Sequence, residues 1–540
     1  MTLAPDKPAR PVGPVRSRSD VIETTLVRAA IVTVVVTLSG SVLGLVRDLL
    51  LARLFGADGG TDAFLVAWTV PETAFPLVVE GAMSFLMIPL FSRALTDARS
   101  EMQAVRGVVA ATLPRVVVAL VALSATVALG APVLVRVVAP GLADPALAVT
   151  CTRLTSITVL TFGITGYLSA ALRARHVFGA PAAIHLAYNI GILGLMWTLH
   201  GRLGIVSAAA GVALGSVFMV MVQLPTFLRH VGLPRRFAVG GSAVTLGAFA
   251  PIGVYTLARQ AQVFVERFLG SSLAPGTISH LNYAQKVAQL PMLVALLVCT
   301  VTFPTLARSV AAGEAATARR RLEADLRTVT GLIFVAVAYL VVFAPVIVRV
   351  LLEHGRFGPA DTAATASIMR VYSLGLFGHA LVGVVSRPFF TGRPPEHPAG
   401  APGRGPIWYP AAAMLAGLTV TAVLAVAGVR LVGVYAIAAA NGVGITTTAV
   451  ALLVGLRGRV VAVSLPAVGS ATARLAAVAV GAGAVGFVAG RAMTGWPPIV
   501  VAAVGGLVVL AAFTGLARLA GFDEVAVVAS RVKRRIGHGR

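Results

Sequence analysis

The sequence predicts an all-α polytopic membrane protein with about fourteen transmembrane helices. Hydrophobic residues make up 57% of the 540 positions and charged residues only 12%, against about 25% charged residues in a typical soluble protein. Uncharged apolar stretches recur from end to end, and a stretch of about 18 such residues is long enough to cross a hydrocarbon core of ~30 Å as a helix. The second part of the chain also resembles the first, which indicates two related halves.

Each apolar segment is bounded by charged, Gly-rich or Pro-rich residues. Several are longer than the ~20 residues that a perpendicular helix needs, which indicates tilt or extension beyond the bilayer. The fourteen predicted spans are residues 27–52, 62–92, 108–138, 146–172, 178–199, 203–228, 242–269, 279–307, 325–352, 362–391, 408–428, 431–456, 471–491 and 497–521.

The net charge of +24 is a topology signal rather than a sign of nucleic-acid binding. Its Lys and Arg residues fall mostly in alternate loops, and such loops lie on the cytoplasmic side. Both termini are therefore expected in the cytoplasm, which requires an even number of spans. The predicted organisation is a basic N-terminal segment (1–26), an N-lobe (27–228), a cytoplasmic linker (229–241), a C-lobe (242–456), spans 13 and 14 (457–521) and a basic cytoplasmic tail (522–540).

Four ordered matches at offsets of 213 to 215 residues reveal an internal repeat. They are APVLVRVV (131–138) with APVIVRVL (344–351), RLFG (53–56) with RFLG (267–270), PLFSRAL (89–95) with PTLARSV (304–310), and the proline pair 76 and 89 with 291 and 304. Six spans separate the copies, so the two six-helix lobes have the same orientation. Parallel repeats of this kind build transporters that rock about a substrate site between the halves.

Four stretches then carry a resemblance to a known family. They are LGLVRDLLLARLFGADGGTDAF (43–64), EGAMSFLMIPLFSRAL (80–95), LNYAQKVAQLP (281–291) and LLEHGRFGPAD (351–361). These resemble the MurJ (MviN) lipid II flippases of the multidrug/oligosaccharidyl-lipid/polysaccharide exporter superfamily. The resemblance implies two lobes around a central cavity plus two extra C-terminal helices. It also implies flipping of an undecaprenyl-diphosphate-linked peptidoglycan precursor across the plasma membrane by alternating access, with cell-wall synthesis proteins as further partners.

A diphosphate that leaves water needs charge-assisted partners, and three cationic residues are the candidates. Arg47 matches a cavity arginine of the family, although an arginine at a helix end can also snorkel toward water. Lys286 is the only lysine in any predicted span and stands where the family has an arginine. Arg259 lies in the seventh span and would add charge from the facing lobe.

Four further charged residues are interpreted as gating or ion-pair candidates. Asp48 would pair with Arg47, and Arg53 lies six residues further on, about 120° away on an ideal helix. Asp62 matches a family aspartate of the second span and would also suit a helix N-terminus. Glu80 would offset a cationic neighbour.

Three polar residues complete the candidate cavity. Ser41 stands six positions before Arg47, where the family often has arginine. Gln285 and Gln289 flank Lys286 and would hydrogen-bond a sugar or peptide, or pair between helices.

The stretch ETAFP (72–76) departs from the family, which usually reads NLLRR here. Phe75 and Pro76 replace the basic pair and Glu72 replaces an asparagine, so the cavity is less cationic than the resemblance implies. Two alternatives therefore stay open: a flippase for another polyprenyl-diphosphate-linked glycan, and a transport-inactive scaffold of cell-wall synthesis. A drug or cation antiporter would favour an acidic cavity.

Nothing in the sequence indicates catalysis or a bound cofactor. The nucleotide-binding pattern G-x-x-x-x-G-K-[ST] is absent, the nine histidines are scattered, and the two cysteines lie in apolar segments. We therefore expect no enzyme activity, cofactor, metal or nucleic-acid partner.

Overall fold

The computed structural model describes residues 18–96, 101–234, 250–293, 314–390, 408–459 and 461–522, with five isolated positions between 295 and 312. Within these ranges every regular element is a helix. A helix satisfies its own backbone hydrogen bonds, so helices are the form in which such apolar segments can cross lipid. The chain is therefore a multi-pass, all-α membrane protein.

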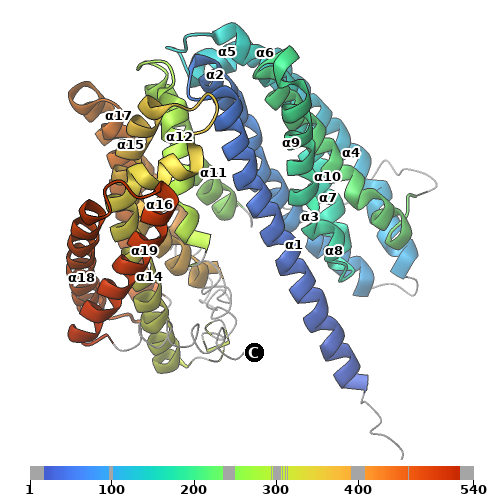
Figure 1. Ribbon diagram of the computed structural model, residues 1–540. Helices are drawn as coiled ribbons and strands as arrows, with labels where there is room; N and C mark the ends of the chain where they lie inside the picture. The colour runs from blue at the N-terminus through green and yellow to red at the C-terminus, as the bar shows by residue number, and fades with distance from the viewer. Residues whose placement is uncertain are drawn as a thin grey trace, which may run out of the picture.

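The N-terminal half forms one bundle, coloured blue to green in Figure 1. Its helices are α1 (Arg18–Phe55), α2 (Gly59–Ala74), the π-helix η1 (Phe75–Ala82), α3 (Met83–Thr96), α4 (Glu101–Leu129), α5 (Ala131–Val138), α6 (Pro145–Thr155), α7 (Ile157–Ala174), α8 (Gly179–Ala182), α9 (Ile184–Leu203) and α10 (Val206–His230).

The rest of the described chain forms a second bundle, with α18 and α19 packed on the outside of α14 (Figure 1). The side chain of Phe343 on α14 lies against Gly486 and Gly505 of these two helices. The elements of this bundle are α11 (Ala250–Gly270), α12 (Thr277–Ala288), α14 (Ala315–Leu352), α15 (Pro359–Val385), the 3-10 helix η3 (Arg387–Phe390), α16 (Tyr409–Val432), α17 (Val434–Arg459), α18 (Leu465–Ala492) and α19 (Pro498–Leu519).

Eleven helical segments of the described chain are long and apolar enough to cross a membrane. The fifth, seventh and eighth predicted spans are not among them. Helices α9 and α11 do cover much of the fifth and seventh, whereas the eighth begins as the 12-residue α12 and most of its remainder lies outside the described residues. The total of fourteen thus stays a prediction, and the segment 388–406 lies almost wholly outside the described residues.

Several predicted spans, the second, third and fourth among them, contain breaks that apolar patterning does not show. The second is a composite of α2, η1 and α3, and the π-helix begins immediately before Pro76, which has no N–H for a regular helical bond. The third breaks at Gly130 between α4 and α5, and the fourth breaks at Ser156 between α6 and α7. Hydrophobic length alone therefore locates these spans but not their bends.

The two bundles meet through a pair of matching loop contacts. Oγ of Ser271 accepts a hydrogen bond from the N–H of Gly141 at 3.2 Å, and the N–H of Arg356 donates to the carbonyl of Arg53 at 2.9 Å. Gly141 and Gly355 are 214 positions apart, so each repeat presents the same loop to the other. This two-way contact is what an interface between two copies related by a two-fold axis produces, here between the halves of one chain.

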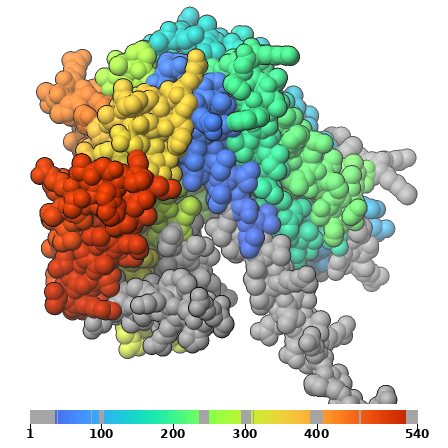
Figure 2. All heavy atoms as spheres, viewed as in Figure 1, coloured from blue at the N-terminus to red at the C-terminus, as the bar shows by residue number. Residues whose placement is uncertain are grey.

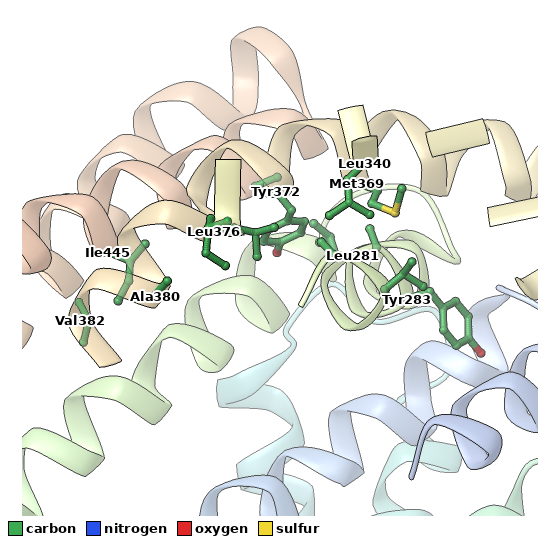
Figure 3. Packing of buried hydrophobic residues seen from close by; sticks show 14 of the residues in the cluster. Leu281, Tyr283, Leu340, Met369, Tyr372, Leu376, Ala380, Val382 and Ile445 are labelled. Carbon is green, nitrogen blue, oxygen red and sulfur yellow. The ribbon is translucent and has the colours of Figure 1, made fainter. Parts of the chain in front are cut away.

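In the upper half of Figure 2 the yellow surface of the C-terminal bundle lies beside the blue surface of the N-terminal bundle. Figure 3 shows how α12 joins the two sides. Leu281 packs beside Met369 and Leu340 of the C-terminal bundle, whereas Tyr283 extends toward the blue helices. Its hydroxyl donates to the carbonyl of Gly56 at 3.2 Å, so α12 belongs to one bundle and is anchored on the other.

Candidate functional site

A small cavity lies where α1 and α2 face α12 across the interface. Arg47, Asp48 and Trp68 line it from the N-terminal bundle, and Asn282 and Lys286 line it from the C-terminal bundle. Its volume is about 10 Å³, which is about the space of a single water molecule. The structure thus brings Arg47 and Lys286, two of the three cationic candidates, into one cavity with little free space.

The guanidinium of Arg47 is held on three sides. Its Nε and Nη2 donate to Oδ1 of Asp48 at 3.0 and 2.8 Å, and its Nη1 donates to Oδ1 of Asn189 at 3.4 Å. The charged carbon lies 4.5 Å from the ring centre of Trp68, within the range of a cation–π contact. Arg47 is therefore a positioned and largely compensated charge at the cavity wall.

Close packing of α1 on α9 puts Asn189 beside Arg47. A Cβ on Gly40 would lie 2.6 Å from the Cβ of His185, so only a glycine allows α1 to approach α9 at this point. Nδ2 of Asn189 donates to the carbonyl of Gly40 at 3.1 Å and to that of His185 at 2.9 Å. The amide is thereby fixed with its oxygen facing Arg47.

Lys286 pairs with a carboxylate of the other bundle. Its Nζ lies 3.3 Å from Oε1 of Glu72 on α2, and Nη2 of Arg267 on α11 lies 3.8 Å from Oε2 of the same side chain. Arg267 is only 2% exposed, whereas Glu72 is 18% and Lys286 33% exposed. One carboxylate is therefore shared by two cations across the interface.

Gln260 anchors the backbone of Glu72. Pro76 has no N–H to give to the carbonyl four residues earlier, which is that of Glu72. Nε2 of Gln260 on α11 donates to this carbonyl at 2.8 Å. The proline that departs from the family pattern thus creates a further contact between α2 and α11.

Asp62 also contacts the opposite bundle, through backbone donors. Its Oδ2 accepts from the N–H of Gly276 at 2.7 Å, and its Oδ1 accepts from the N–H and hydroxyl of Ser279 at 2.7 and 2.6 Å. These donors belong to the start of α12, where the helix dipole favours a negative charge. Helix α2 itself is capped by Asp58, whereas Asp62 caps α12 of the other bundle, and its role as a gating residue stays a prediction.

The remaining charged candidates do not line the Arg47 cavity. Glu80 is exposed on η1, where the charges of Arg259 on α11 and Arg173 on α7 act on it. Arg259 is likewise exposed. Arg53 is an exposed residue at the end of α1 whose carbonyl accepts the hydrogen bond from Arg356.

The three polar candidates do not line this cavity either. Ser41 is exposed and donates to the carbonyl of Thr37 in its own helix at 3.3 Å. Gln285 and Gln289 are half-buried on and just after α12. Their roles in substrate contact stay predictions.

Sequence reasoning missed Glu72 and Arg267 as members of the site. Glu72 appeared only as a departure from a family pattern, and Arg267 only as the first residue of the RFLG repeat match. A signal was nevertheless present, because Glu72 and Lys286 are 214 positions apart, the offset that relates RLFG to RFLG. Residues at the same position of two repeats can face each other across the axis that relates them.

A buried polar chain in the C-terminal bundle was also missed. Nδ2 of Asn441 donates to Oε1 of Glu266 at 2.8 Å, and Nε2 of His379 lies 3.1 Å from the amide oxygen of Asn441. Glu266 and Asn441 are 2% and 1% exposed. This chain holds α11, α15 and α17 together next to Arg267.

Comparisons with known proteins agree with this architecture. The family described as lipid II flippase MurJ matches residues 51–505. The lipid II flippase MurJ of Burkholderia cenocepacia is 26% identical over 388 residues, covering 68% of this chain and 73% of that protein. The probable lipid II flippase MurJ of Vibrio cholerae is 25% identical over 427 residues, covering 75% and 78%.

Solved structures support the same fold. A structure of lipid II flippase MurJ in an inward closed conformation superposes with a TM-score of 0.73 and 19% identity, covering 90% of this chain and 99% of that one. An inward-facing multidrug transporter of the MATE family, in the MOP superfamily, superposes with a TM-score of 0.62 and 14% identity, covering 82% and 99%. At these identities the likeness concerns the fold.

Proposed function

Because the chain belongs to the lipid II flippase MurJ family, we propose that it moves lipid II across the plasma membrane by alternating access. Lipid II joins a polyprenyl tail to a glycopeptide head through a diphosphate. The observation that carries the proposal is that Arg47 and Lys286, one from each bundle, line the same cavity. A cation from each side lets one diphosphate contact both bundles, so binding can change how they pack.

The orientation follows from the predicted cytoplasmic N-terminus. Helix α1 runs from Arg18 to Phe55, so its last residues lie toward the outside. Asp62, Gly141 and Tyr283 make their contacts with the opposite bundle near this end. These contacts close the outer side, and transport requires that they separate while the inner side closes.

The proposed roles follow from position. Arg47 and Lys286 would hold the diphosphate, and Asp62 would hold the outer side closed through α12. The charge of Arg259 on α11 acts on Glu80 on η1, and these two residues would pair the bundles at a second level. Gln285 and Gln289 would serve the polar head group. No nucleotide motif is present in the sequence, so the free energy would come from an ion gradient or the membrane potential.

Two observations keep other cargoes and roles in view. Glu72 compensates the charge of Lys286, which would suit a transport-inactive scaffold as well as a regulated carrier. A flippase for a different polyprenyl-diphosphate-linked glycan would need the same cations. A cation antiporter is disfavoured by two basic residues at the cavity.

Replacement of the native flippase in a depletion strain tests the proposal. We expect growth with the wild-type chain, and loss of growth with Arg47→Ala and with Lys286→Ala at equal membrane expression. Arg349→Ala is the matched control, because Arg349 is an exposed cation that pairs with Glu353 within its own bundle. Failure of a well-expressed wild-type chain would exclude lipid II as the cargo.

A further inference from the structure

The carboxylate of Glu72 occupies the place where an incoming anion would meet Lys286. Its Oε1 accepts a hydrogen bond from Nζ of Lys286 at 3.3 Å. Lys286 is a third exposed and lines the same cavity as Arg47. A diphosphate that reached this cavity would compete with Glu72 for the same ammonium group.

The second partner of Glu72 makes such competition feasible. A buried carboxylate that loses its only cation is costly, because an uncompensated charge remains away from water. Glu72 would keep Arg267, whose Nη2 lies 3.8 Å from Oε2. Nε and Nη1 of Arg267 are buried and have no hydrogen-bond partner within the described residues, so Arg267 has donors left for a carboxylate that moves closer.

We propose that Glu72 is an internal counter-anion that a substrate diphosphate must displace from Lys286, and that it thereby sets the affinity and specificity of the site. The proposal rests on the function proposed above, and deepens it. Glu72 belongs to α2 and Lys286 to α12, so displacement also removes a contact between the two bundles. The contact of Glu72 with Arg267 on α11 would remain, so the two bundles would stay joined at this carboxylate.

Glu72 lowers the net positive charge of a cavity that already has fewer cations than the family pattern. A strong cationic cavity binds a diphosphate tightly in the state that accepts it and releases it slowly. A carboxylate next to Lys286 returns to the ammonium when the substrate leaves, and so replaces the substrate as counter-ion. Glu72 is thus a positioning residue that acts on the substrate through Lys286.

Equilibrium binding of farnesyl diphosphate to the full-length protein in lipid nanodiscs tests this inference. At fixed low ionic strength we expect Glu72→Gln to bind about five- to tenfold more tightly than wild type, and Lys286→Gln to bind more weakly. In the double variant Glu72→Gln/Lys286→Gln the gain should shrink, because the carboxylate acts largely through Lys286. The gain should also fall as salt rises, since it is electrostatic.

Glu353→Gln is the matched control. It removes one carboxylate that pairs with Arg349 outside the cavity, and its affinity for farnesyl diphosphate should stay within twofold of wild type. If Glu72→Gln does not yield folded protein, Glu72→Asp keeps the charge but shortens the reach to Lys286, and should bind about two- to threefold more tightly.

Unchanged or weaker binding by folded Glu72→Gln, or by Glu72→Asp where it is used, would overturn the inference. The inference and the proposed function fail separately. A wild-type chain that cannot support growth, together with a tighter Glu72→Gln variant, points to another polyprenyl diphosphate as cargo. A chain that supports growth without any change in Glu72→Gln leaves lipid II transport standing and removes the counter-anion.

Discussion

The carboxylate of Asp62 on α2 accepts a hydrogen bond of 2.7 Å from the N–H of Gly276 at the start of α12. These two residues are 214 positions apart in the sequence. The equivalent position of the second repeat thus supplies the backbone donor that the first repeat's carboxylate binds. Gly276 has φ +89°, a left-handed conformation that favours glycine. Asp62 is only 4% exposed, so the contact is buried.

A disulfide between the bundles should lock the outer side closed. A Cβ on Gly59 would lie 3.7 Å from the Cβ of Pro275, and Cβ atoms of a disulfide are typically 3.5–4.5 Å apart. We expect Gly59→Cys/Pro275→Cys, with Cys151 and Cys299 replaced by alanine, to cross-link under mild oxidation and to lose flipping in proteoliposomes. Reduction should restore flipping, and each single-cysteine variant should be insensitive to oxidant. Full flipping by the cross-linked form would contradict an outer opening at this point.

Removal of the Asp62 carboxylate should loosen that same contact. Asp62→Ala deletes three hydrogen bonds and leaves two backbone N–H groups of α12 without their acceptor. Hydrogen bonds to a charged group contribute about 1.5–3 kcal/mol each. We expect the Gly59→Cys/Pro275→Cys pair to cross-link at least fivefold more slowly in the Asp62→Ala background, measured by gel shift over time. Asp62→Asn, which keeps one acceptor oxygen, should be intermediate, and an unchanged rate would show that the loops alone hold the contact.

Alanine at Gly40 should destabilise the packing of α1 on α9. The new Cβ would lie 2.6 Å from the Cβ of His185, and forcing an extra methyl group into packed structure costs about 1–3 kcal/mol. The variant should show a lower apparent melting temperature in detergent and weaker diphosphate binding, because Asn189 would no longer hold Arg47. Gly194→Ala in α9 is the control, since its Cβ would meet nothing within 4 Å. Equal melting temperatures for the two variants would remove the argument from close packing.

The helical class and the repeat were predictable because both depend on pattern over many residues. The length of an apolar segment indicates whether it can cross the bilayer, and the offset between two repeats stays recognisable after many substitutions. The breaks at Gly130 and Ser156 were not predictable in the same way, since glycine and serine also occur inside regular membrane helices. The π-helix after Ala74 depends on one proline and on what packs against it.

The site was predictable in part. Arg47 was proposed because it matches a cavity arginine of the family, and Lys286 because it is the only lysine in any predicted span, where a charge is costly. Asp48 was predicted to pair with Arg47 because the two are sequence neighbours, and the structure contains this ion pair. Glu72 and Asn189 were not predicted as partners, because they are distant in sequence from Lys286 and Arg47. The repeat also predicts that residues at equivalent positions have equivalent surroundings, which is not always so. Arg53 and Arg267 are equivalent by offset, yet Arg53 is exposed and Arg267 is buried. Each repeat has therefore specialised its copy of the same position.

Exchanging the charges of Glu72 and Lys286 should separate the role of the ion pair from the role of the cation. Glu72→Lys alone places three cations together and Lys286→Glu alone places two carboxylates together, so each should lower the melting temperature, because like charges repel at this distance. The double exchange Glu72→Lys/Lys286→Glu restores an opposite pair at equivalent positions of the two repeats, and its melting temperature should recover most of the loss. In the double exchange the cation lies on α2, and the carboxylate lies on α12, the side of Arg267. We therefore expect growth support to recover less than the melting temperature does. If growth and melting temperature recover to the same extent, the site needs only one positive charge near the axis that relates the repeats. If neither growth nor melting temperature recovers, the two repeats do not place these side chains equivalently.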